Sequence, residues 1–162
     1  MRSPADRITE PAGRLWLADA ALAAAVADAR RRQPREACGV LVGSACTARV
    51  AIAVLNLALS PGRFELDPLG LAGVERDVRR SGRQLVGYYH SHPRAALAPS
   101  TEDIGGTLWA EEGPHWHLIV SPAGDWALFD TRHRPWRAAR AVLPPRHYAR
   151  DLSAGPARPV SS

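Results

Sequence analysis

Short apolar runs of strand type alternate along this chain with two stretches of helical composition, and this alternation limits the fold classes open to it. One helix is expected over residues 19–32, where Ala and Leu predominate, an acid stands in the first turn and three arginines occupy the last. Pro34 ends this helix, and Pro68 opens a second one that runs to about Arg80. The pattern predicts a mixed α/β domain whose helices pack on a mostly antiparallel sheet.

The expected strands are rich in apolar and β-branched residues and are bounded by Gly, Pro and Ser. They cover Arg14–Leu17, Cys38–Val42, Thr47–Leu59, Gln84–Tyr89, His117–Val120 and Trp126–Asp130. The last two form a hairpin around Pro122-Ala123-Gly124, while Gly43-Ser44 and Ser60-Pro61-Gly62 are expected to be turns. A short helix is expected to begin at Ser100.

The 162 residues are enough for one domain with a substantial core. We expect a flexible N-terminus over residues 1–13, a single domain over 14–150 and a disordered tail over 151–162. No apolar run approaches the roughly 18 to 20 residues that span a bilayer. The Ala-rich stretch 18–29 carries two acids and does not resemble a signal peptide, so a cytoplasmic location is expected.

The formal net charge is +5, and all 21 basic residues are Arg. A lysine Schiff base or lysine general base is therefore excluded. A basic chain can indicate a nucleic-acid surface, but outside residues 30–32 and 132–150 the arginines are scattered and no nucleic-acid-binding motif accompanies them. No nucleic-acid partner is expected. Two cysteines, Cys38 and Cys46, are too few for a disulfide scaffold, and both are expected to be reduced.

A possible metal site comes from the end of the strand that begins at Gln84. His90 and His92 stand two apart there, and residues two apart on a strand face the same way. Asp103 lies three residues into the expected short helix and could supply a carboxylate oxygen. Two imidazoles and one carboxylate, with a fourth position open to water, are typical of a catalytic zinc. Ser100 and Asp103 also match a capping box, which alone would explain both residues.

The stretch His90-Ser91-His92-Pro93, followed by Pro99-Ser100 and Asp103, resembles the signature of the JAMM (MPN-plus, Mov34/PAD-1-like) metallopeptidase family. That family also places a Glu near the start of an early strand, and Glu36 matches it within residues 34–43. The similarity covers about residues 14–130 and includes Asn56, residues 63–68 and residues 87–89. It implies the family's cytidine-deaminase-like α/β (α+β type) fold, a mostly antiparallel mixed sheet flanked by helices.

The resemblance implies a role for each matching residue. His90, His92 and Asp103 would hold one Zn²⁺ per domain, Glu36 would be the general base, and Ser100 would hydrogen-bond the developing oxyanion. A bound metal lowers the pKa of its water towards about 7. A carboxylate outside the ligand set then shuttles the proton to the leaving amine, and general bases of this kind contribute roughly a hundred- to ten-thousand-fold.

Other residues leave alternatives open. His115 and His117 stand two apart and could form a second metal site, although Trp116 and the apolar run after it favour an ordinary strand. Cys38 stands two residues after Glu36, so it shares the same side of the strand and could approach the zinc, although a small buried core residue is the simpler interpretation. The five tryptophans are expected in the core or on a partner surface.

Two other hydrolase classes do not fit the chain. A zinc nucleoside deaminase needs His-x-Glu followed by Pro-Cys-x-x-Cys, and neither motif is present. A serine hydrolase of the α/β type needs a Gly-x-Ser-x-Gly elbow, which is also missing.

The family cleaves peptide or isopeptide bonds after the C-terminal Gly-Gly of ubiquitin-like proteins. The short loops and residues 64–68 look like its compact prokaryotic members, which are associated with ubiquitin-fold sulfur carriers. The resemblance therefore implies a sulfur-carrier or ubiquitin-like substrate with a Gly-Gly tail. A non-catalytic module that binds such a partner, and a zinc hydrolase of another small peptide or amide, remain open. So does the oligomeric state.

Two expectations concern how such a carrier is held. Its tail could add as a strand to an exposed sheet edge beside residues 94–99. The arginine-rich surface could steer an acidic carrier towards the cleft.

Overall fold

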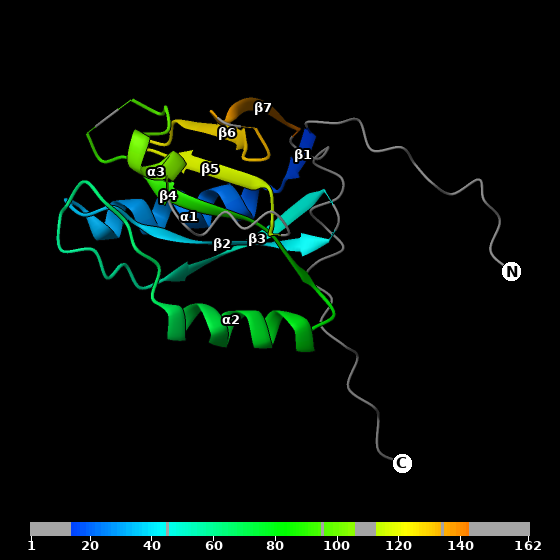
Figure 1. The fold of residues 1–162 in the computed structure, drawn as a ribbon. Coiled ribbons are helices and arrows are strands. Elements are labelled where there is room, and N and C mark those ends of the chain that lie inside the picture. The colour runs from blue at the N-terminus through cyan, green and yellow to red at the C-terminus, as the bar shows by residue number, and fades with distance from the viewer. Residues whose placement is uncertain (1–13, 45, 95, 106–112, 134, 143–162) are drawn as a thin grey trace, which may run out of the picture.

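The computed structural model describes residues 14–44, 46–94, 96–105, 113–133 and 135–142. The expectations for the N-terminus (1–13), for residues 143–150 of the expected domain and for the tail (151–162) lie outside these residues. Among the helices described, none is long and apolar enough to cross a lipid bilayer. The elements in chain order are β1 (Arg14–Leu17), α1 (Asp19–Arg32), β2 (Cys38–Ser44), β3 (Thr47–Val54), α2 (Pro68–Arg80), β4 (Gln84–Ser91), α3 (Thr101–Gly105), β5 (Trp116–Val120), β6 (Trp126–Asp130) and β7 (Arg137–Val142) (Figure 1).

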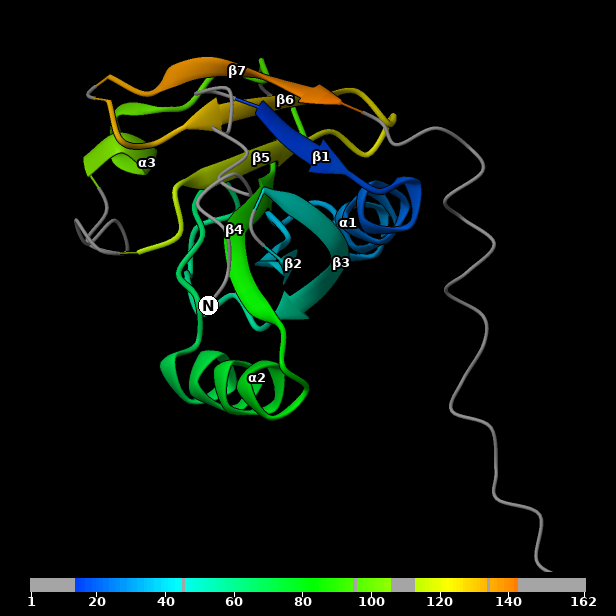
Figure 2. The same ribbon diagram turned by 90° about the vertical axis from the view of Figure 1, so that its right-hand side faces the viewer.

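The seven strands form a closed barrel in the order β1-β3-β2-β4-β5-β6-β7 (Figure 2). Four of the pairings are antiparallel, namely β2–β3, β2–β4, β5–β6 and β6–β7. The other three, β1–β3, β1–β7 and β4–β5, are parallel. The predicted mixed, mostly antiparallel α/β fold is thus confirmed.

Closure of the barrel was not predicted, and it has a consequence for substrate binding. Each of the seven described strands has a neighbour on both sides, although β3 pairs with β1 only at Thr47 and Ala48. The strand β4, which leads into residues 94–99, is flanked by β2 and β5. The expectation that a substrate tail adds as a strand at an exposed edge there is therefore wrong.

Several predicted boundaries differ from the structure. Strand β3 ends at Val54 rather than Leu59, because the Asn56 side-chain oxygen accepts hydrogen bonds from the backbone N–H groups of Ala58 and Glu65 and turns the chain. Strand β2 continues through Gly43-Ser44, the expected turn, with a bulge between Val42 and Gly43. The bulge accommodates the change of register without ending the pairing.

At the other end of the chain, strand β7 was not predicted. Strand β4 also extends two residues past Tyr89, so that His90 lies within the strand.

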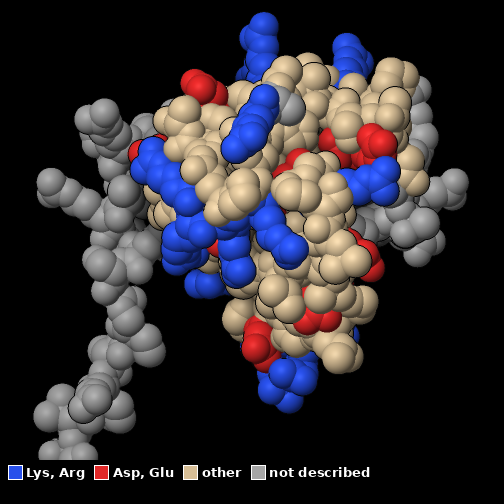
Figure 3. All heavy atoms as spheres, turned by 90° about the vertical axis from the view of Figure 1, so that its left-hand side faces the viewer, with Lys and Arg blue, Asp and Glu red and all other residues tan. Residues whose placement is uncertain are grey.

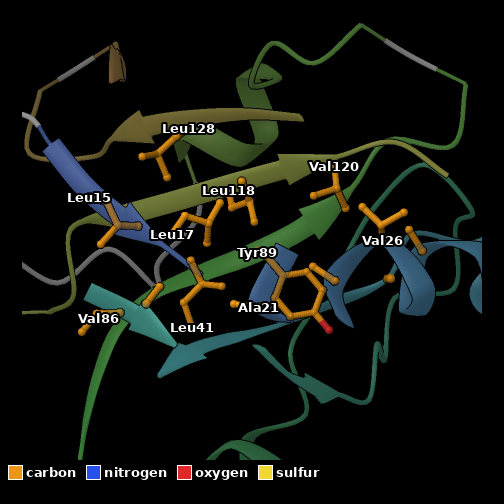
Figure 4. Close-up of a cluster of buried hydrophobic side chains, with 14 residues drawn as sticks. Leu15, Leu17, Ala21, Val26, Leu41, Val86, Tyr89, Leu118, Val120 and Leu128 are labelled. Carbon is orange, nitrogen blue, oxygen red and sulfur yellow. The ribbon is translucent and has the colours of Figure 1, made fainter. Parts of the chain in front are cut away.

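The main core fills the inside of the barrel and is covered by α1 (Figure 4). Tyr89 reaches into this core from β4 and lies close to Gly39 of the neighbouring β2; a Cβ added at Gly39 would stand 2.5 Å from the Tyr89 ring. The cluster consists of Leu15, Leu17, Ala21, Ala25, Val26, Ala29, Ala37, Leu41, Ala48, Val86, Tyr89, Leu118, Val120 and Leu128. Burial of this cluster holds β4 and β5 in one parallel register. That register determines which side chains of the two strands lie next to each other on the outer face.

Two smaller clusters lie on the outer face. One packs under α2, whose first turn is capped by Asp67, and consists of Cys38, Val40, Val42, Val54, Leu66, Val78 and Tyr88. The other, formed by Ile119, Phe129 and Trp136, packs against Ile104 of α3. On the outer face of β4, Tyr88 belongs to the cluster under α2. His90 is paired with Ile119, which belongs to the other cluster. His90 therefore lies between the two clusters.

The cysteines and tryptophans follow from this layout. Cys38 is buried in the cluster under α2 and Cys46 is partly exposed, and neither forms a disulfide within the described residues. Trp136 is buried, Trp116 and Trp126 pack partly buried against the main core, and Trp16 is 38% exposed. The fifth tryptophan, Trp109, lies outside the described residues.

Candidate metal centre

Three side chains converge where β4 ends. His90 comes from the last residues of β4, His92 follows β4 directly, and Asp103 is contributed by α3. The Nε2 atoms of the two histidines lie 2.9 Å apart, and Asp103 Oδ2 lies 3.4 Å and 3.6 Å from them. All three side chains are buried. They form the one group of three metal-type donors within 4.8 Å of one another that the described residues contain.

The hydrogen bond made by the other nitrogen of His92 determines its tautomer. His92 Nδ1 lies 2.6 Å from the carbonyl oxygen of Ala96. Because a carbonyl only accepts, Nδ1 carries the proton and donates it. In the neutral ring, Nε2 is then left with a lone pair directed at His90 and Asp103, as a metal ligand requires.

His90 is held between aromatic rings and is not exposed at all. The Phe64 ring stacks on it, with centroids 4.5 Å apart and planes inclined by 18°. On another side, His90 Nδ1 lies 2.5 Å from Nε2 of His117. Burial lowers the pKa of His90, so the neutral form that binds metals is favoured.

Asp103 caps α3 and also faces the two histidines. Its backbone N–H donates to Ser100 Oγ at 3.1 Å, and its Oδ2 accepts from the backbone N–H of Ser100 at 2.6 Å. This reciprocal pair is the capping box at the start of α3. Burial alone would raise the pKa of Asp103, but the close contacts of its carboxylate with His90 and His92 outweigh it and lower the pKa. The same carboxylate therefore caps a helix and stays ionised beside the histidines.

Glu36 lies two residues before the start of β2, beside the histidines. Its neighbour Ala37 donates its N–H to Ser91 Oγ at 2.8 Å and accepts from the N–H of Ser91, the residue between His90 and His92. Glu36 is only 6% exposed. Burial raises its pKa from 4.5 to about 7, although the nearby His92 lowers it and Asp103 raises it further.

The backbone around Glu36 is held by a single amide side chain. Asn56 Nδ2 donates to the carbonyls of Glu36 and Arg63, at 2.9 Å and 3.0 Å. Its Oδ1 accepts from Ala58 and Glu65, so the amide makes four hydrogen bonds. Glu36 N–H also donates to the carbonyl of Pro61. The loop after β3 thereby fixes the position of Glu36 relative to β4.

The three donors suit Zn²⁺. Ligands held tetrahedrally at 2.0 to 2.2 Å stand roughly 3.3 to 3.6 Å apart. The separations here, 2.9, 3.4 and 3.6 Å, are close to that range. Imidazole and carboxylate groups are also among the ligands that zinc prefers.

The predicted site residues fall into two groups. His90, His92, Asp103 and Ser100 lie together, and Glu36 is adjacent to them through Ala37 and Ser91. Cys38 is not one of the converging donors: its thiol lies 3.7 Å from the Val54 carbonyl, within the cluster under α2. The simpler interpretation of Cys38, as a small core residue, is the one the structure supports.

His115 and His117 do not form a second centre among the described residues. His115 lies before β5, and its carbonyl accepts from Thr131. His117 is fully buried and is directed towards His90 instead. The contact of His117 with His90, the stacking of Phe64 and the clamp formed by Asn56 were all missed, because each joins residues far apart in the sequence.

The barrel, its flanking helices and the converging donors define a domain of the JAB1/MPN type. A JAB1/MPN domain protein from Archaeoglobus fulgidus superposes with a TM-score of 0.54, covering 80% of this chain and 98% of that one at 20% identity. The family model described as prokaryotic homologs of the JAB domain matches residues 18–138, and the chain belongs to that family. The resemblance predicted from the sequence is confirmed.

Two curated relatives illustrate the family. A desampylase of Haloferax volcanii is 37% identical over 94 residues, which is 56% of this chain and 66% of that protein. A CysO-cysteine peptidase of Mycobacterium tuberculosis is 36% identical over 98 residues, 59% of this chain and 66% of that protein. The matched stretches thus span just under two thirds of the length of each relative.

Proposed function

We propose that this chain is a zinc-dependent peptidase or isopeptidase that hydrolyses the amide bond after the C-terminal Gly-Gly of a ubiquitin-like or sulfur-carrier protein. The observation that carries the proposal is the convergence of three buried donors beside a buried acid, Glu36, whose pKa lies near 7. The names of the relatives support the choice of substrate, since they describe the removal of cysteine or of a protein modifier.

His90, His92 and Asp103 would hold the Zn²⁺. When bound, the ion would act as a Lewis acid, lowering the pKa of water and polarising the scissile carbonyl. The tautomer of His92 and the ionised state of Asp103 both match what such ligands need.

Glu36 would move the proton. As a carboxylate it takes a proton from the attacking water, whose oxygen bonds to the carbonyl carbon. As a carboxylic acid it then gives that proton to the amine nitrogen while the C–N bond breaks. A pKa near 7 suits both directions of transfer. Burial and the backbone clamp from Asn56 keep the carboxyl in position.

Ser100 would stabilise the oxyanion that develops on the carbonyl. Its hydroxyl already accepts the Asp103 N–H, which orients the Oγ atom at the edge of the centre. A hydroxyl that accepts one hydrogen bond still has its own proton to donate. Removing one such donor typically costs about a hundred- to a thousand-fold in turnover.

The basic surface of the molecule supports the proposal of an acidic partner. Figure 3 shows the side of the molecule on which α3 lies, and arginine side chains are prominent across it. Opposite charges accelerate encounter more than they tighten the final complex. Raising the salt concentration should therefore slow association of the carrier while leaving turnover of bound substrate nearly unchanged.

The test compares wild-type protein with Glu36→Gln, using a carrier joined to cysteine or lysine through its Gly-Gly tail. The variant should retain zinc while turnover falls by at least about a hundredfold. Glu75→Gln, the same change on α2, is the matched control and should turn over normally. A near-normal rate in Glu36→Gln would contradict the assignment of the base.

A second arm examines the tail itself. Glycine lets the substrate backbone approach a buried centre closely, so a carrier ending in Ala-Ala should be cleaved far more slowly than one ending in Gly-Gly. Changes after the scissile bond should matter less. Equal cleavage of both tails would instead favour a small free amide as the substrate, and carrier binding without any cleavage would favour a non-catalytic module.

A further inference from the structure

The two histidines at the metal centre are supported by different chemical groups. His92 Nδ1 donates to a backbone carbonyl, that of Ala96. His90 Nδ1 instead faces an imidazole nitrogen, Nε2 of His117, at 2.5 Å. Metal-binding histidines usually rest on a carboxylate, a carbonyl or a water, so an imidazole in this position is unusual.

His117 is held firmly enough to direct its partner. It lies on β5 and is 0% exposed. The Trp136 ring packs on one side with centroids 4.7 Å apart, and the Phe64 ring lies 6.0 Å away. The parallel pairing of β4 and β5 sets the register that brings His117 diagonally opposite His90. The pair is thus fixed by the strand pairing of the barrel and by the packing of neighbouring rings.

The hydrogen bond permits only one arrangement of protons when His90 binds a metal through Nε2. A neutral His90 must then carry its proton on Nδ1, and Nδ1 donates to His117. Nε2 of His117 must be the acceptor, so His117 carries its own proton on Nδ1. Both rings are neutral in this arrangement, which costs less in a buried site than a charged ring would.

We propose that His117 is a positioning residue for the metal centre, one that fixes the tautomer and ring orientation of His90 through the His90 Nδ1–H···Nε2 His117 hydrogen bond. The inference rests on the metal site of the proposed function, but not on any peptidase activity. It predicts that His117 tunes metal affinity although it does not touch the metal. Losing such a support typically weakens metal binding by roughly ten- to a hundredfold.

The experiment measures the zinc dissociation constant by competition with a chromogenic chelator. His117→Leu keeps an apolar side chain but removes the acceptor, and zinc binding should weaken by roughly ten- to a hundredfold. His117→Gln keeps an acceptor oxygen near the position of Nε2 and should recover most of the affinity. His115→Leu, a histidine change two residues away and outside the centre, is the matched control and should bind as wild type.

The outcomes separate the possible failures. Equal affinities of His117→Leu and wild type would overturn the inference. So would equal weakening of His117→Leu and His117→Gln, because a packing defect would then explain the loss. Absence of zinc binding in the wild type would contradict the metal site of the proposed function instead.

A second measurement needs no variant at position 117 to fold. Nitrogen NMR of the histidine rings in the zinc-bound wild type should show His90 protonated on Nδ1, and His117 protonated on Nδ1 and bare on Nε2. The ring signals of His117 can be assigned from the contacts of its backbone with Tyr88, its partner on β4. A His117 ring protonated on Nε2 would overturn the proposal.

Discussion

Two buried acids, Asp28 and Glu36, show how this protein treats the same chemical group in different ways. Asp28, on α1, is 2% exposed, and its carboxylate accepts from Tyr89 Oη at 2.9 Å and pairs with Arg31 and Arg32 at 3.3 Å and 3.5 Å. Glu36 is 6% exposed, yet within the described residues its carboxylate takes part in no hydrogen bond or ion pair. Its backbone is clamped by Asn56, while none of the described residues pairs directly with its carboxylate.

The difference separates an acid that serves the fold from one that can exchange a proton near neutral pH. The lone pairs of Asp28 are used by Tyr89 and the arginines, so it fastens α1 to the inside of the barrel. Burial without such partners raises the pKa of Glu36 to about 7, so this acid exchanges a proton near neutral pH. Asp103 has features of both acids, because its carboxylate caps α3 and also faces the histidines of the candidate metal centre.

Loss of metal on removing a ligand is the largest effect expected. The wild-type protein should bind about one zinc per chain, and Asp103→Ala or His90→Ala should bind only a small fraction of that. Asp28→Ala should still bind stoichiometrically, because Asp28 serves the fold. Metal analysis after gel filtration measures this. Stoichiometric zinc in both ligand variants would show that the ligands are misassigned.

Replacing the buried Asp28 should destabilise the fold more than replacing an exposed aspartate. In Asp28→Ala, Tyr89 Oη and the two arginines lose their partner, and the free energy of unfolding should fall by about 2–4 kcal/mol. Asp77→Ala removes an exposed aspartate that also pairs with an arginine and should cost no more than about 0.5 kcal/mol. Urea denaturation at pH 7 compares the two. Equal losses would remove the distinction between buried and exposed pairs.

Glu36 should influence stability in the opposite sense, and only as the pH rises. Because its folded pKa of about 7 exceeds the unfolded value of 4.5, the metal-free wild type loses stability between these two pH values. Glu36→Gln lacks this loss. The variant should match wild type near pH 4.5 and be more stable by about 1–3 kcal/mol above pH 7, the lower end reflecting partial contact with solvent.

The measurement is the unfolding free energy of both proteins in the presence of a chelator across this pH range. Other titrating groups are common to the two proteins and cancel in the difference. A constant difference between pH 4.5 and about 8 would mean that the pKa of Glu36 is not raised.

The smallest effect should come from the helix cap. Ser100→Ala removes the acceptor for the Asp103 N–H and should lower the unfolding free energy by about 1 kcal/mol. Ser100→Thr keeps an acceptor and should recover most of it. Thermal unfolding of the metal-free proteins provides the comparison. If alanine and threonine behave alike, the capping box contributes nothing and Asp103 acts only towards the histidines.

The parts of the site that sequence reasoning found depend on local geometry. The spacing of His90 and His92 on a strand and the cap from Ser100 to Asp103 each involve residues no more than three apart. Glu36 was found only through family resemblance, because its link to the histidines runs through a hydrogen bond between residues 37 and 91. His117 was placed on a strand, but a partner 27 positions away in sequence depends on strand pairing that periodicity does not reveal.

The same distinction between local and distant contacts explains which strands could be predicted. Strands β5 and β6 form a hairpin with a short turn, and the boundaries of β6 were predicted correctly. Strand β7 contains three alanines, two arginines and one valine, a composition with weak strand preference. It becomes a strand because it pairs with β6 on one side and with β1 on the other.

The closed barrel also governs how the chain must fold. Its seam joins β1 to β7, so residues 14 and 140 stand side by side. Pairing of such distant segments is slow, because the entropy of the long loop is lost before the contacts form. During synthesis the seam cannot close until Val142 has left the ribosome, and until then β1 and β6 each lack a neighbour. An unpaired strand edge can pair with other chains, so the nascent protein is most exposed to aggregation just before β7 emerges.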